Sequence, residues 1–107
     1  MSVQGCQYSK LITATSVAAA VGFTDNLTTI AFNATSVYIN NGGATGSTST
    51  VYFNLTSTAV GTTANGYPLR AGENVTIISQ EKHGGWPGLG YTCSGSASVD
   101  VRVLATR

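Results

Sequence analysis

Short runs of β-branched and aromatic residues, separated every few positions by Gly, Asn and Ser, make up most of this chain from Leu11 onward. The clearest run covers residues 50–56, where Val51, Phe53 and Leu55 fall on one face of an extended strand. Such side chains pack well on a pleated sheet and lose rotamer freedom in a helix. No sustained helical period of 3.6 residues accompanies them, so the pattern favours an all-β fold.

The expected strands are short and closely spaced. They cover residues 11–17, 27–32, 36–40, 50–56, 74–78, 91–93 and 97–104. Residues 16–21 also fit one helical turn capped by Ser16, but a strand is preferred because so short a helix is marginal. In the last strand Val99, Val101 and Val103 are expected to face inward, and the charged residues between them outward. We predict a single antiparallel β-sandwich domain with a jelly-roll-like arrangement.

The chain of 107 residues has the size of one domain. Residues 1–8 are expected to form an N-terminal arm that reaches across a subunit boundary, with residues 9–107 forming the sandwich. The longest apolar stretch, residues 17–23, is far shorter than the roughly 20 residues of a membrane-spanning helix, so no membrane partner is expected. The first residues lack the basic start and apolar core of a secretory signal, which favours synthesis in the cytoplasm.

Charge is scarce. Only nine of the 107 residues are Asp, Glu, Lys or Arg, whereas Ser and Thr together number 27. Isolated soluble domains use roughly a quarter charged residues, which keep their surfaces hydrated and apart. A surface of small neutral groups is therefore expected to be covered by a partner. The net charge of +1 comes from scattered basic residues, so no nucleic-acid partner is expected.

The same scarcity limits the chemistry. The chain has four carboxylates, one His and two Cys, and no pair of them has the spacing of metal ligands. No nucleophile-elbow motif supports a hydrolase, so neither catalytic residues nor a cofactor is expected. Cys6 and Cys93 form either a structural disulfide or two buried free thiols.

The one long loop, residues 80–90, is the best candidate for partner contact because it concentrates charge, glycine and the single Trp. The candidate contact residues are Tyr8, the first large apolar anchor of the arm, together with Glu81, Lys82, His83, Trp86 and Leu89. Trp86 has two alternatives: it stacks on a sugar, or it folds back over an open end of the sandwich.

Four segments give the chain a recognisable order of parts. They are SVYINN at 36–41, TVYF at 50–53, GYPLRAGENVTI at 66–77 and SVDVRVL at 98–104. This order resembles small β-sandwich structural proteins of tailed bacteriophages, most of all the capsid decoration (cement) proteins. The likeness covers about residues 36–104 and does not extend to the 80–90 loop.

The resemblance implies a non-enzymatic virion protein that binds between subunits of the major capsid protein and stabilises the phage head. It further implies a homotrimer on the capsid exterior, made in the host cytoplasm. A tail or head-fibre component is the alternative within the virion. A carbohydrate-binding module that uses Trp86 is the alternative outside it.

Overall fold

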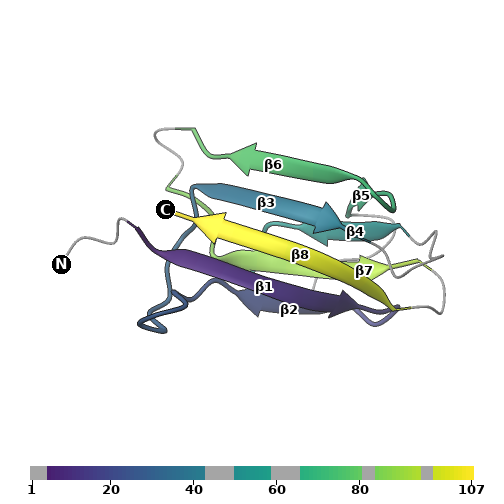
Figure 1. Cartoon of the computed structure of the whole chain (residues 1–107), viewed down its shortest axis with the longest axis horizontal. Helices are drawn as coiled ribbons and strands as arrows, with labels where there is room; N and C mark the ends of the chain where they lie inside the picture. The colour runs from purple at the N-terminus through teal and green to yellow at the C-terminus, as the bar shows by residue number, and fades with distance from the viewer. Residues whose placement is uncertain (1–4, 43–49, 59–65, 81–83, 95–97) are drawn as a thin grey trace.

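The computed structural model describes residues 5–42, 50–58, 66–80, 84–94 and 98–107. Within these ranges eight strands form two four-stranded antiparallel sheets that pack face to face (Figure 1). One sheet has the order β1 (Gln7–Ala14), β8 (Val99–Thr106), β3 (Ser36–Asn41), β6 (Asn74–Ile78). The other has the order β2 (Ala19–Gly22), β7 (Gly88–Cys93), β4 (Val51–Asn54), β5 (Tyr67–Leu69). The predicted β-sandwich is confirmed.

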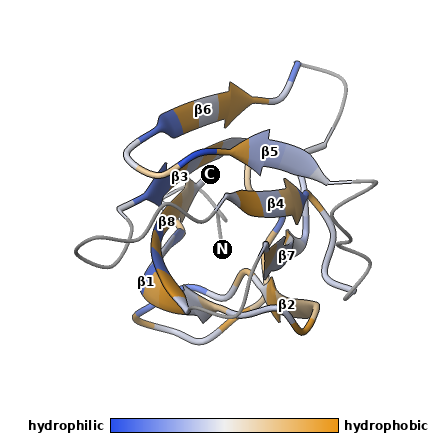
Figure 2. Ribbon diagram, turned by 90° about the vertical axis from the view of Figure 1, so that its right-hand side faces the viewer, coloured by the Kyte–Doolittle hydropathy of each residue, from blue (hydrophilic) through white to orange (hydrophobic). Residues whose placement is uncertain are grey.

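The strand order follows a simple rule. β1 pairs with β8, β2 with β7, β3 with β6 and β4 with β5. The pairing is therefore that of one long hairpin whose turn lies between β4 and β5. The hairpin is rolled up, so that successive strand pairs lie in alternate sheets. This is the order of a jelly roll. Figure 2 looks along the roll and shows the strands surrounding a common interior.

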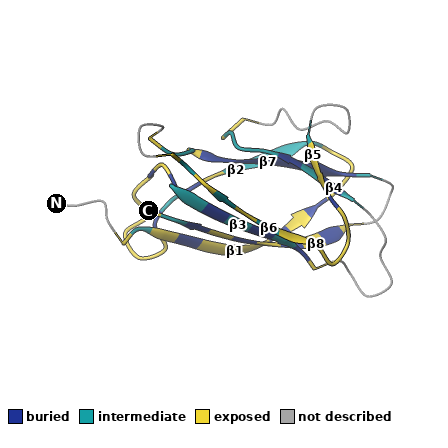
Figure 3. Cartoon of the chain, turned by 90° about the horizontal axis from the view of Figure 1, so that it is seen from above, coloured by how far each residue is buried: buried dark blue, intermediate teal, exposed yellow. Residues whose placement is uncertain are grey.

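The core lies between the two sheets. Val99, Val101 and Val103 are at most 2% exposed, while Asp100 and Arg102 between them are exposed, as the alternation predicts. Figure 3 shows buried residues on strands of both sheets. The buried apolar set is completed from the other strands and the connections: Tyr8, Ile12, Ala14, Phe23, Phe32, Ala34, Val37, Ile39, Val51, Phe53, Leu69, Leu89, Tyr91, Cys93 and Ala105.

The predicted strand at residues 27–32 is wrong. This stretch belongs to a loop over residues 23–35, which begins with a tight turn built around Asp25. Asp25 Oδ2 accepts hydrogen bonds from Thr28 N at 3.0 Å and Thr28 Oγ1 at 2.9 Å. The backbone of Thr29 then adopts a positive φ of 60°, which ends any extended run. A side chain that bonds to its own neighbouring backbone offers the chain an alternative to a strand.

The boundary of the N-terminal arm also needs correction. Gln7 and Tyr8 are the first two residues of β1, and Tyr8 is buried against the core. Gly5 and Cys6 are tied by backbone hydrogen bonds to Arg107 of the same chain. From Gly5 onward the chain thus belongs to its own sandwich. Residues 1–4 lie outside the described part.

Two further strands, β5 and β7, differ from expectation. β5 forms in spite of Pro68 because it lies at a sheet edge, where a missing N–H donor is tolerated. β7 begins at Gly88, inside the predicted loop. A Cβ there would collide with the backbone of Val21 and Ser57, so only glycine allows this strand to sit between its neighbours. In the described part of the chain there is no helix of the length and apolarity needed to cross a membrane.

Core packing predicts that replacing isoleucine by alanine has a larger effect at a buried position than at an exposed one. Ile39 is fully buried in β3, and Ile30 is 53% exposed in the 23–35 loop. Ile39→Ala should cost about 2–5 kcal/mol of unfolding free energy because it leaves a cavity. Ile30→Ala should cost about 0.5 kcal/mol or less. Urea unfolding at one fixed protein concentration measures both, and equal costs would contradict the described core.

Asp25 predicts an acid-sensitive turn. Hydrogen bonds from the Gln7 backbone, the Thr28 side chain and the Thr28 backbone hold the pKa of Asp25 below its usual 3.8. A carboxylate with a depressed pKa stabilises the fold above its unfolded pKa, and this contribution disappears as the pH falls from about 4 toward the lower folded value.

Asp25→Asn should therefore lower the melting temperature at neutral pH. The difference in melting temperature between the variant and the wild type should become smaller in acid. Thermal unfolding of both proteins across this pH range provides the test. A gap that stays constant with pH would show that the charge of Asp25 does not stabilise the turn.

Candidate functional site

Described residues from both segments predicted for partner contact, Gly5–Cys6 and residues 84–87, lie at the same end of the sandwich. Gly5 N donates to Arg107 O at 2.9 Å, and Arg107 N donates to Cys6 O at 3.1 Å. The Arg107 side chain reaches the other segment, since its Nη1 donates to Gly84 O at 3.3 Å. We call this region the terminus end: Gly5–Cys6, the 23–35 loop, residues 84–87 and Arg107. Figure 1 shows the chain termini at this end.

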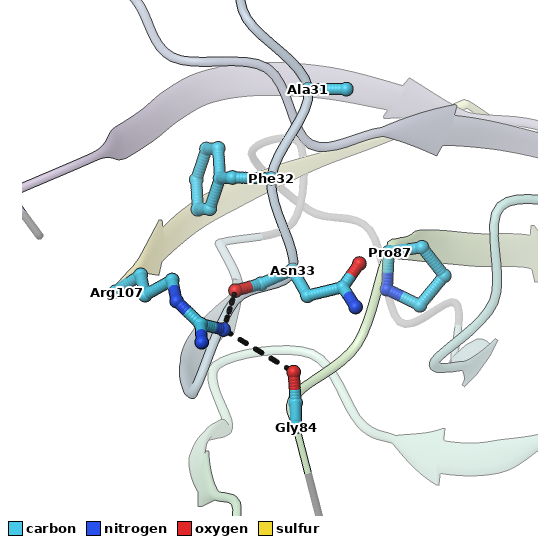
Figure 4. A pocket seen from close by; sticks show the side chains of 6 residues that line it. All are labelled: Ala31, Phe32, Asn33, Gly84, Pro87 and Arg107. Atoms are coloured by element: carbon cyan, nitrogen blue, oxygen red, sulfur yellow. Dashed lines mark hydrogen bonds between the residues drawn. The ribbon is translucent and has the colours of Figure 1, made fainter. Parts of the chain in front are cut away.

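A hollow of about 400 Å³ opens in the terminus end (Figure 4). It is lined by Ala31, Phe32, Asn33, Gly84, Pro87 and Arg107. Arg107 Nη1 also donates to Asn33 O at 3.0 Å, so one guanidinium ties the 23–35 loop to residues 84–87. The remaining guanidinium N–H groups have no acceptor among the described residues. A guanidinium N–H group can donate to a carbonyl or carboxylate of a partner.

Trp86 is held by the 23–35 loop. Its backbone exchanges two hydrogen bonds with Ala34, each 2.8 Å long, and its side chain is partly buried against the core. This placement favours the alternative in which the indole folds back over an open end of the sandwich. A partly buried indole still leaves some of its surface for contact.

Two candidate contact residues are corrected by their burial. Tyr8 is 6% exposed and Leu89 is fully buried, so both side chains contribute to the core of their own chain. In the sequence, the size and position of Tyr8 predict an anchor of the arm. Its ring instead packs on Phe23, with 5.6 Å between ring centroids. Glu81, Lys82 and His83 lie outside the described residues.

The 23–35 loop is the part of the site that the sequence missed. Phe23 and Phe32 anchor it to the core, with ring centroids 6.3 Å apart. Between them Leu27 is 93% exposed and Ile30 is 53% exposed. Leu27 therefore presents an exposed apolar side chain on a turn fixed by Asp25. In the sequence the same residues resembled an ordinary strand.

The two cysteines lie far apart in the sandwich. Cys93 Sγ donates to Ala14 O at 3.5 Å at the end of β1, whereas Cys6 precedes the start of that strand. Eight strand residues span roughly 26 Å, far beyond the reach of a disulfide. No disulfide joins Cys6 and Cys93, and burial raises the pKa of Cys93, which disfavours the nucleophilic thiolate. Among the described residues no group of three or more potential metal ligands gathers.

The close approach of Trp86 to Ala34 predicts different effects at two glycines. Gly84 and Gly85 both have positive φ, at 84° and 87°. A Cβ at Gly84 would meet no atom of the described residues within 4 Å, whereas a Cβ at Gly85 would collide with the Ala34 carbonyl. Gly84→Ala should cost roughly 1–2 kcal/mol through its backbone alone, and Gly85→Ala clearly more.

Thermal unfolding of the two variants makes the comparison. The same melting temperature for both would mean that residues 84–86 do not pack against Ala34 as described.

Comparison with known proteins supplies no family for this chain. No family model matches it, and no curated protein matches its sequence. The function is therefore proposed from the residues and geometry of the chain itself.

Proposed function

We propose that this chain is a non-enzymatic virion protein that decorates a phage capsid, binding on the exterior between subunits of the major capsid protein. The observation that carries the proposal is the composition of the terminus end. It joins exposed Leu27 and Ile30, a hollow lined by Phe32 and Pro87, and the guanidinium of Arg107. Exposed apolar groups beside an available arginine are typical of the energetic centre of a protein interface.

The surrounding surface supports a permanent contact. With nine charged residues in 107, little electrostatic repulsion or strong hydration opposes close packing of the faces. Each contact with a shell subunit is modest, but many copies on a closed shell add their contributions. The jelly-roll order of the strands is also used by viral capsid domains, which is an analogy of fold and carries less weight than the site.

The proposal predicts that Leu27 is needed for head binding. Leu27→Asp places a charge where a desolvated apolar contact is expected, and should weaken binding to empty heads at least about tenfold. The turn should survive, because the Leu27 side chain is 93% exposed. Binding is measured by cosedimentation of the purified chain with empty heads of the virus that encodes it.

Val17→Asp is the matched control. Val17 is 72% exposed in the connection from β1 to β2, at the opposite end of β1 from the chain termini. It should bind heads as well as the wild type does. A wild-type chain that fails to bind heads would overturn the proposal, and binding to tails instead would assign the chain to the tail. Equal losses in the two variants would mean that the terminus end is not the contact.

A further inference from the structure

The four sheet edges differ in how well they are protected from pairing with another strand. Natural β-proteins protect exposed edges with short strands, proline, inward-pointing charges or covering loops. β1 carries exposed Lys10 in the row of inward-facing residues and is covered in part by Asp25 and Asn26. β5 has three residues with Pro68 in the middle, and β2 has four residues.

Among the described residues, β6 shows none of these features. It has the sequence NVTII, with five residues and neither charge nor proline. No other strand of the described chain covers its outer edge, as Figure 1 shows at the top of the view. An edge of this kind is a template for one more strand.

The hydrogen-bond pattern shows which backbone groups β6 offers. Ser79 N donates to Thr35 O, and Asn41 N donates to Glu73 O, so the odd-numbered positions along β6 bond to β3. In an antiparallel ladder the positions alternate. The N–H and C=O groups of Asn74, Thr76 and Ile78 therefore point away from β3, toward the outer edge.

We infer that β6 is the edge through which two copies of this chain associate about a two-fold axis. An antiparallel pair centred on Thr76 places Asn74 opposite Ile78 of the second copy and Thr76 opposite Thr76. The three outward positions then fall on hydrogen-bonded pairs, because the ladder repeats every two residues. A segment that pairs with itself in this way makes an isologous contact.

The absence of charge in β6 favours pairing with a second copy of β6 over pairing with a charged segment of another protein. Within β6 no ionisable side chain is present, so no like charges meet across the axis. Just beyond the strand, Glu73 falls opposite Ser79 of the second copy. On the inner face Val75 meets Ile77 of the other copy, which is a favourable pair of β-branched residues.

An apolar groove beside β6 enlarges the contact. It has a volume of about 340 Å³ and is lined by Phe53, Asn54, Leu55, Tyr67, Val75 and Ile77. Tyr67 is 59% exposed at its rim. Five strand residues span only about 17 Å, whereas a stable interface needs about 800 Å² from each partner. The side of the molecule that carries β6 and the groove extends over 44 Å and 20 Å, so this side as a whole is large enough for a contact of that size.

The test uses the full chain and three substitutions. Wild type should sediment as a species of twice the 10.9 kDa chain mass at micromolar to millimolar concentrations. Thr76→Lys puts two like charges on the axis and should raise the dissociation constant about tenfold or more. Thr13→Lys is the matched control, because Thr13 is also exposed in an edge strand. It should leave the dimer intact.

Mixing Thr76→Lys with Thr76→Glu tests the register. The opposite charges then face each other, so the mixture should associate more tightly than either variant alone. Circular dichroism should show that all variants keep the β-sheet signal of the wild type.

Several results would overturn the inference. They are a monomeric or trimeric wild type, a Thr76→Lys chain that dimerises as before, dissociation by Thr13→Lys as well, or no recovery in the mixture. The inference does not depend on the capsid, and it gives a two-fold dimer in place of the homotrimer that the phage resemblance implies. A chain that dimerises through β6 but ignores phage heads would refute the proposed function alone.

Discussion

The pairing of β8 with both β1 and β3 holds this molecule together. β8 lies between these strands in its sheet and contributes Val99, Val101 and Val103 to the core. Its partner β1 lies at the other end of the sequence, so the roll closes only when the two ends of the chain meet. Such distant pairing costs loop-closure entropy before any contact repays it, which makes folding of this topology slow compared with local structure.

The terminus end is a direct consequence of that closure. Arg107 follows β8 immediately, and its backbone continues the ladder to Gly5 and Cys6. Its side chain then reaches Asn33 and Gly84, so three distant segments meet at one residue. The proposed partner contact depends on this meeting, because none of the three segments forms the hollow alone. The 23–35 loop is positioned by the same core through Phe23 and Phe32.

The two proposed contacts use different physics. At the terminus end, exposed Leu27 and the guanidinium of Arg107 offer apolar burial and charge-assisted hydrogen bonds to a partner of another kind. Along β6 the backbone itself is the donor and acceptor, and the lack of charge lets identical strands approach. The low charge of the chain favours both contacts, because few charged groups have to be desolvated when a partner covers the surface. Leu27 lies in the 23–35 loop and β6 is an edge strand of a sheet, so the two contacts use different residues.

The sequence by itself determined the all-β class, the strands around Val51, Val75 and Val101, and the sparse chemistry, because alternation and composition are local properties. Tertiary structure decided what local pattern could not: that Tyr8 and Leu89 are core residues, and that residues 27–32 form a loop. Asp25 competes with the strand by bonding Gln7, a neighbour only in the folded chain. The neighbours of each strand determine which residues are buried, which strands lie at a sheet edge and which segments meet at Arg107. That order is set by packing of the whole chain and not by any one segment.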